Sequence, residues 1–176
     1  AQLARTEALY SVTRSLVGLG GLDELLRLVV DTIAQALPAD LIAILILDVE
    51  ARKTIDVVLG GRRRNDWHPL TFEQIIHGLP GQALLSGKPI RSTRGVLRPI
   101  PGPGGELLAD PGSVLVAPLQ FQAVSYGVMM ALNWGTANHF SAQDLELLAA
   151  MANQASVAIS RADIFDDTIQ TLEQVR

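Results

Sequence analysis

The chain of 176 residues contains no cysteine. Disulfides, thiolate metal sites, iron–sulfur clusters and thioether-linked cofactors are therefore all excluded. Histidine occurs only three times, and aromatic side chains make up only 5% of the chain. No stretch approaches the roughly 18 consecutive apolar residues that a membrane span needs. We expect a cytoplasmic domain that makes no membrane contact of its own.

Charged residues are also few, at 18% of the chain, whereas 48% of the residues are apolar. This balance predicts a folded domain with a substantial core, and the length suits one domain. The formal charge of −4 is unevenly distributed. Residues 52–98 hold nine Lys or Arg and three Asp or Glu, whereas the remainder holds five and fifteen. A basic middle therefore lies between acidic ends.

Two helices are predicted at the start of the chain. The first covers residues 2–16, presents Leu9, Val12 and Leu16 on one stripe, and stops at the glycine pair 20–21. Because a helix begins so early and residue 1 is Ala, we expect a segment of a longer protein. The second helix is predicted with Asp23 as its cap and an end before Pro38.

Four strands are predicted from apolar runs. Leu41–Val49 and Thr54–Leu59 form one pair, and Val114–Phe121 and Tyr126–Asn133 flank a polar turn as a hairpin. Because several of these runs are apolar at nearly every position, both faces of the sheet must be covered.

Short helices and a long loop are expected between the two strand pairs. Thr71 and Gln74 form a capping-box pattern at the start of one helix, which residues 78–81 should end. A second short helix is predicted over residues 82–85. Residues 92–113 are rich in Pro and Gly, which indicates a long loop over the fold.

The last helix has a clear start signal. Ser141 is the predicted cap, Phe140 and Leu145 are the staple pair, and Asp144 lies in the first turn. A heptad-like stripe, interrupted at Asp166, then consists of Leu145, Leu148, Ala152, Ala155, Ile159, Ala162 and Ile169.

Three stretches of the chain share their order and spacing with a known family. They are Asp23–Leu26 with Pro38–Asp40, Gly81–Ala83 with Ser86–Ile90, and a closing part formed by residues 118–119, 127–128, 140–145 and 152–159. Together these stretches resemble a GAF domain, a sensory module. The resemblance covers roughly residues 8 to 165. It implies an α/β (α+β) fold, in which a central antiparallel sheet carries the N- and C-terminal helices on one face and short helices and loops over a ligand pocket on the other. We expect a linker or dimerisation helix at 1–21, the GAF domain at 22–165 and the start of a signalling helix at 166–176.

Catalysis and metal binding find little support among the residues. A reductase related to GAF domains works through cysteines, and covalent bilin attachment also needs one. His68 and His77 lack carboxylates at a metal-ligand spacing and are interpreted as surface residues. A haem-ligand role for His139 is the weaker alternative to a loop position.

Two further ligand classes, cyclic nucleotides and nucleic acids, are matched only in part by the sequence. Asn133, Phe140 and Asp144 match part of a cyclic-nucleotide motif, but Trp134 and Leu145 replace its Lys and Glu. Staple and cap roles explain Phe140 and Asp144 sufficiently. The run Arg62–Arg64 lacks the aromatic platforms usual in nucleic-acid sites, which favours a solvated loop.

The resemblance and the local charge together predict a pocket for an anionic small molecule. The expected apolar wall consists of Trp67, Phe72, Ile75, Ile76 and Met129. Arg91, Arg94 or Arg98 would supply the positive charge, although simple exposure of these arginines is the competing interpretation.

The function we expect is that of a non-catalytic sensory domain in a signalling protein, with a sensor histidine kinase as the leading host. A ligand-free dimerisation spacer and the effector domain of a transcriptional regulator are the alternatives. Apolar stripes on the first helix and on the last, at Ala155, Ile159, Ala162 and Ile169, predict a parallel homodimer. The competing interpretation is that these stripes cover the sheet of a monomer.

Overall fold

The computed structural model describes residues 21–67, 69–92, 112–134 and 140–175, with side chains as far as Ala162 in the last range. Five strands form one antiparallel sheet in the order β2-β1-β5-β4-β3. The strands are β1 (Leu41–Asp48), β2 (Lys53–Gly60), β3 (Ile90–Ser92), β4 (Ser113–Phe121) and β5 (Val124–Asn133). The helices are α2 (Leu22–Ala36), α3 (Phe72–Ile76), α4 (Leu79–Ser86) and α5 (Ala142–Val175), with a 3-10 turn η1 (Arg64–Asp66).

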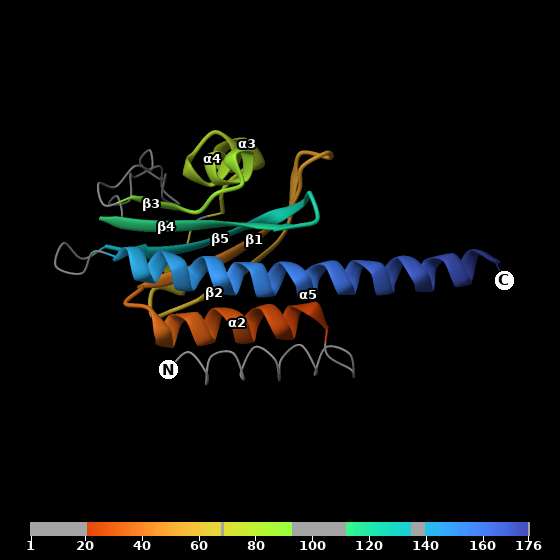
Figure 1. The fold of residues 1–176 in the computed structure, drawn as a ribbon, viewed down its shortest axis with the longest axis horizontal. Coiled ribbons are helices and arrows are strands. Elements are labelled where there is room, and N and C mark those ends of the chain that lie inside the picture. The colour runs from red at the N-terminus through yellow and green to blue at the C-terminus, as the bar shows by residue number, and fades with distance from the viewer. Residues whose placement is uncertain (1–20, 68, 93–111, 135–139, 176) are drawn as a thin grey trace.

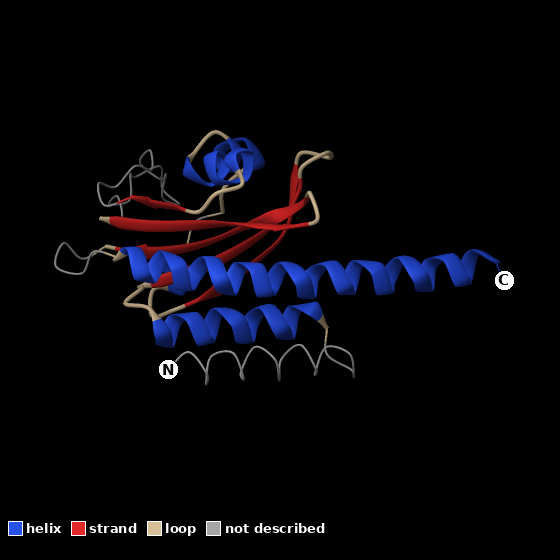
Figure 2. Cartoon of the chain, in the orientation of Figure 1, coloured by secondary structure: helices blue, strands red, loops and turns tan. Residues whose placement is uncertain are grey.

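Helices cover the sheet on both sides. Figures 1 and 2 show α2 and α5 side by side against one face, and α3 and α4 together against the other. This arrangement confirms the predicted fold class, with the long helices on one face and the short helices on the opposite one.

The alternation along β1 explains why both faces need a cover. Ile42, Ile44 and Ile46 pack into the apolar core beneath α2 and α5, which we call the α2–α5 layer. The intervening Leu41, Ala43, Leu45 and Leu47 pack into a second core beneath α3 and α4, which we call the α3–α4 layer. Successive side chains of a strand point to opposite faces, so an all-apolar strand must be buried twice.

Helix α2 begins differently from the prediction. Its N-cap is Gly21, which makes no side-chain cap bond, and Asp23 lies in the first turn instead. A carboxylate there still interacts favourably with the helix dipole. The predicted end is confirmed, since the last helical residue, Ala36, precedes Pro38 by two positions.

Helix α5 begins as the sequence predicts. The backbone N–H of Asp144 donates to Ser141 Oγ at 3.1 Å, and the N–H of Ser141 donates to Asp144 Oδ2 at 2.8 Å. The helix has 34 residues, which corresponds to about 51 Å at ~1.5 Å per residue. Figure 1 shows its C-terminal part running past the end of the sheet. Among the described helices, none has the length and hydropathy needed to cross a membrane.

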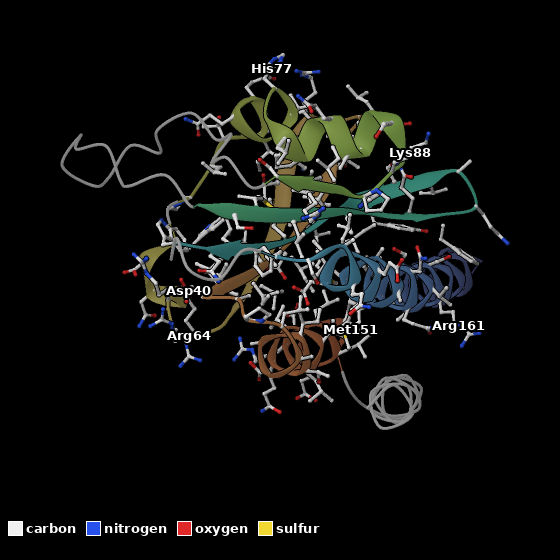
Figure 3. All side chains as sticks on the ribbon, turned by 60° about the vertical axis from the view of Figure 1, so that its left-hand side comes forward. Asp40, Arg64, His77, Lys88, Met151 and Arg161 are labelled. Carbon is white, nitrogen blue, oxygen red and sulfur yellow. The ribbon has the colours of Figure 1, made fainter. Side chains whose placement is uncertain are left out.

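Part of the predicted apolar stripe of α5 is buried within the domain. Ala155 and Ile159 are only 1% and 2% exposed because they pack onto the sheet within the α2–α5 layer. Figure 3 shows Met151 of the same helix directed into the space between α5 and α2. These two side chains are therefore used within the domain, whereas the predicted dimer itself stays a prediction. Ile169 and the first-helix stripe lie outside the described side chains.

The hairpin β4–β5 is confirmed, and so is the first strand pair, whereas β3 was not predicted. Gly127 in β5 has φ of +146°, and a Cβ there would overlap the carbonyl oxygen of Leu45 in β1. Only glycine therefore permits the close pairing of β5 with β1. Most of the predicted loop 92–113 lies outside the described residues.

Candidate functional site

Helix α3 forms on the α3–α4 side from a local capping signal. The hydroxyl of Thr71 accepts from the Gln74 N–H at 3.2 Å, and the Gln74 side chain accepts from the Thr71 N–H at 2.9 Å. The predicted capping box is thus confirmed. It orients a five-residue helix so that Phe72 and Ile75 are buried against the sheet.

Helix α4 begins earlier than predicted. Gly78 is its N-cap and Pro80 lies in its first turn. Proline is tolerated there because the backbone N–H that it lacks would have no partner within the helix. The segment 78–81 therefore starts this helix as well as ending α3. A Cβ at Gly81 would overlap the backbone of Ile76, so glycine allows α4 to pack closely on α3.

The α3–α4 layer is the candidate ligand-binding face. Its buried apolar members come from both short helices and from the three strands β1, β4 and β5. They are Leu41, Ala43, Leu45, Leu47, Phe72, Ile75, Leu79, Ala83, Leu84, Val114, Val116, Val128, Met130 and Leu132. The partly buried Trp67, Leu70 and Ile76 pack around them. One buried hydroxyl among the described residues, Thr54 Oγ1, has no hydrogen-bond partner.

Four of the five predicted wall residues meet in this layer. Phe72 and Ile75 are buried in it, and Trp67 and Ile76 pack against it. Met129 is a wrong assignment, because it is buried on the opposite face, in the α2–α5 layer. Its neighbour Met130 occupies the predicted place, as expected for adjacent residues of one strand.

The predicted cationic residues do not lie on this face within the described chain. Arg91 pairs with Leu115, which belongs to the α2–α5 layer, so its side chain is on the side of the long helices. There its guanidinium donates to the carbonyl oxygen of Phe140 at 3.0 Å. Arg91 therefore does not lie on the candidate ligand-binding face. Arg94 and Arg98 lie outside the described residues.

A charged contact fastens α3 to the β1–β2 turn. Arg52 donates to Glu73 Oε1 through Nε at 3.1 Å and through Nη2 at 2.5 Å, and its guanidinium lies 5.3 Å from the Phe72 ring centre. These bonds from Arg52 hold the pKa of Glu73 below its ordinary value. His77 Nε2 adds a 3.2 Å contact to the same carboxylate, so that this histidine, contrary to the prediction, has a carboxylate within reach. Its ring projects to the outside in Figure 3. Position 52 has a φ of +55°, so the turn itself is strained.

A second polar cluster at the opposite end of β1 was missed by sequence reasoning. The Asp40 carboxylate accepts from Arg62 Nε at 2.7 Å and from the backbone N–H of Trp134 at 3.0 Å. The guanidinium of Arg63 lies 4.2 Å from the Trp134 ring centre, and Gly61 lies against the Asp40 carbonyl. An acidic residue directly before a buried apolar run was the available signal, because such a carboxylate needs partners.

This cluster also explains much of the basic run. Arg62 pairs with Asp40, and Arg63 pairs with Asp66 at 2.7 Å, so two of the three charges have acidic partners. Arg64 is exposed and projects from the same end of the molecule as Asp40 in Figure 3. The arrangement fits the predicted solvated loop.

The residues of the partial cyclic-nucleotide motif have structural partners. The side-chain amide of Asn133 donates to the Pro38 carbonyl at 2.6 Å, Phe140 is buried beneath α5, and Asp144 caps that helix. Within the described residues no three His, Asp or Glu side chains cluster as metal ligands would. His68 and His139 lie outside the described part of the chain.

The model of the GAF domain family matches residues 21–160. No curated protein matches the chain. Among solved structures, the GAF domain of an Acinetobacter phosphoenolpyruvate-protein phosphotransferase has a TM-score of 0.68 and 19% identity, over 92% of this chain and 95% of that one.

Two further structures show how widely this fold is used. The free methionine-R-sulfoxide reductase of Neisseria meningitidis matches with a TM-score of 0.64 and 16% identity, over 88% of this chain and 87% of that one. The GAF domain of a candidate sensor histidine kinase from Pseudomonas syringae pv. tomato matches with a TM-score of 0.60 and 16% identity, over 97% and 94%. At such identities the likeness shows the fold alone, and the residues must carry any functional argument.

Proposed function

Since the chain belongs to the GAF domain family, we propose that it is a non-catalytic sensory domain of a cytoplasmic signal-transduction protein. A small molecule binds at the α3–α4 layer, and the terminal helices pass the change to an output domain. A sensor histidine kinase is the leading host, in keeping with the fold shared with the Pseudomonas domain.

The main support for the proposal is the difference in length between the helices that cover the two faces of the sheet. On one side α3 and α4 have only five and eight residues, whereas α5 on the other side has 34. Helices this short are marginal by themselves and depend on their packing. A ligand that replaces some of this packing can move them at small energetic cost, while α5 provides a rigid element that leaves the domain.

The proposed ligand is still an anionic small molecule, but one of the three arginines predicted to bind it lies on the other face of the sheet. The described side chains of the α3–α4 layer are apolar and would enclose the body of a small molecule. With Arg91 on the other face, Arg94 and Arg98 are the two predicted arginines left to bind a carboxylate or phosphate group. The alternative of a ligand-free spacer requires no such group.

Native mass spectrometry of the freshly purified protein tests for a retained small molecule. A thermal-shift screen of anionic metabolites then tests the class, using wild type, Arg94→Ala and Arg98→Ala. A ligand at a hundred times its Kd should raise Tm by about 5–10 °C for a domain of this size. If nothing is retained and no compound raises Tm, the spacer is the better function. If the compound raises the Tm of both variants by as much as that of wild type, the ligand is not bound through these arginines and the anionic class is contradicted.

We further propose a parallel homodimer formed by the terminal helices. Because Ala155 and Ile159 are used within the domain, the contact falls on α5 from Ala162 onward, including Ile169, and on the stripe Leu9, Val12 and Leu16. Sedimentation equilibrium should give a dimer at tens of micromolar that Ile169→Asp weakens. Leu85→Asp, on the exposed side of α4, is the control. A wild-type monomer contradicts the proposal.

A further inference from the structure

The short strand β3 faces both layers of the domain at once. Ile90 pairs with Val116 and packs against the α3–α4 layer, and Ser92 pairs with Val114 of the same layer. Between them, Arg91 pairs with Leu115 of the α2–α5 layer. The backbone of β3 therefore connects a side chain at the candidate ligand face directly to one beside the long helices.

The side chain of Arg91 forms a hydrogen bond to Phe140, two residues before α5 begins at Ala142. Its Nη1 donates to the carbonyl oxygen of Phe140 at 3.0 Å, across 49 positions of sequence. The N–H of Phe140 in turn donates to Ser113 Oγ at 3.1 Å, inside the protein. Ser141, the next residue, is the cap of α5. Both backbone groups of Phe140 are thus held by side chains from the strands at one side of the sheet.

Strand β3, which carries Arg91, is the shortest of the described strands. Strand β3 has three residues and, among the described strands, lies at the edge of the sheet and pairs with β4 alone. A bond from a charged donor to a backbone carbonyl is stronger than a neutral one. The start of α5 is therefore attached by a firm bond to an element that can shift easily. By contrast, Ser113 belongs to a nine-residue strand paired on both sides.

We propose that Arg91 is the positioning residue that transmits a change in the α3–α4 layer to the first turn of α5. When the packing around Ile90 changes, β3 shifts and the guanidinium of Arg91 moves or releases the Phe140 carbonyl. The first turn of α5 then changes its stability or direction. This inference rests on the proposed function in one respect, namely that ligand binding at the α3–α4 layer is the event that moves β3 in the cell. The bond itself and its coupling are properties of the ligand-free chain.

A double-mutant cycle followed by amide hydrogen exchange tests the coupling in the 176-residue chain. Ile90→Ala removes packing at the α3–α4 layer, and Arg91→Ala removes the donor to Phe140. NMR exchange rates of the amides of residues 140–148 report the start of α5, and the amides of β1 and β5 serve as an internal reference for global opening. Arg161→Ala, an exposed arginine of α5, is the matched control.

We expect Arg91→Ala to increase the exchange of these amides about fivefold to tenfold, as the loss of one charge-assisted bond implies. Arg91→Lys should restore part of the protection. Ile90→Ala should increase the same rates in the wild-type background and add nothing in the Arg91→Ala background. The reference amides should be unchanged throughout. Where Ile90→Ala also speeds the reference amides, Ile90→Val replaces it.

Two results would overturn the inference. Unchanged exchange in Arg91→Ala would mean that the bond does not hold α5. If Ile90→Ala does not change these exchange rates, or changes them equally in the wild-type and Arg91→Ala backgrounds, Arg91 holds the start of α5 but transmits no change from the α3–α4 layer. Neither outcome bears on ligand binding, which the mass-spectrometric and thermal-shift experiments decide separately. The two proposals can therefore fail independently.

Discussion

The carboxylate of Asp40 accepts a hydrogen bond from the backbone N–H of Trp134, 94 positions further along the chain. The same carboxylate, whose side chain is only 9% exposed, pairs with Arg62, whose side chain is 77% exposed. One interior group thus joins the start of β1 to the end of β5, where the chain leaves the sheet toward α5.

Removing Asp40 should destabilise the domain more than removing Arg62. Asp40→Ala removes the buried carboxylate that accepts from the Trp134 N–H and from Arg62, for which we expect a loss of about 1–3 kcal/mol in the free energy of unfolding. Arg62→Ala leaves the carboxylate with its backbone donor and removes a largely exposed charge, for which we expect less than about 1 kcal/mol. Urea unfolding of both variants measures the difference. Equal losses would mean that the ion pair outweighs the backbone bond.

Glycine at position 81 should be required for the cover of the candidate ligand face. The Cβ of Gly81→Ala would overlap the Ile76 backbone and force α4 away from α3. We expect a loss of about 1–3 kcal/mol, the usual effect of overpacking. Leu85→Ala in the same helix removes a side chain that is 83% exposed and should change stability by less than about 0.5 kcal/mol. Thermal unfolding compares the two, and an unaffected Gly81→Ala would show that the short helices adjust freely.

The adjacent methionines of β5 provide a matched pair for the ligand face. Met130 lies in the α3–α4 layer and Met129 in the α2–α5 layer, and each is at most 1% exposed. Substitution by leucine conserves volume and should cost either variant less than about 1.5 kcal/mol. For the compound that raises Tm most, Met130→Leu should alter the Kd severalfold, whereas Met129→Leu should not. Isothermal titration calorimetry checks this expectation. The reverse result would move the ligand to the other face.

Stability should depend on pH through Asp56. Burial raises the pKa of this carboxyl above its ordinary value of 3.8, and hydrogen bonding and repulsion by Asp23 raise it further, against a lowering by the Val57 N–H and by Arg27. The folded protein then holds the proton more tightly than the unfolded chain does. The favourable contribution is complete below pH 3.8 and disappears as the pH rises through the folded pKa.

Asp56→Asn should therefore stabilise the domain at pH 7 and lose this advantage below pH 3.8. The asparagine oxygen can still accept the Val57 N–H, which Asp56 Oδ1 accepts at 2.9 Å, so the variant changes mainly the charge. Urea unfolding at both pH values gives the sign of the difference. A variant less stable than wild type at pH 7 would contradict the assignment.

The sequence determined those parts of the fold whose causes are local. The Thr71–Gln74 and Ser141–Asp144 caps form as predicted because each needs only residues three positions apart. The strands β1, β4 and β5 follow from apolar runs long enough to be recognised alone. The apolar character of β1 at every position also required a cover on each face, which α2 and α5 and the pair α3 and α4 provide.

Which face a given side chain occupies depended instead on strand register, and this information is not local. A shift of one residue sends every side chain of a strand to the opposite face, so Met129 and Met130 were not distinguishable from composition. The three residues of β3 are too few to show a period, and Arg91 was therefore assigned to the wrong side. The partners of Asp40 and of Phe140 lie 22 to 94 positions away. Such contacts exist only once the sheet has brought its distant strands together.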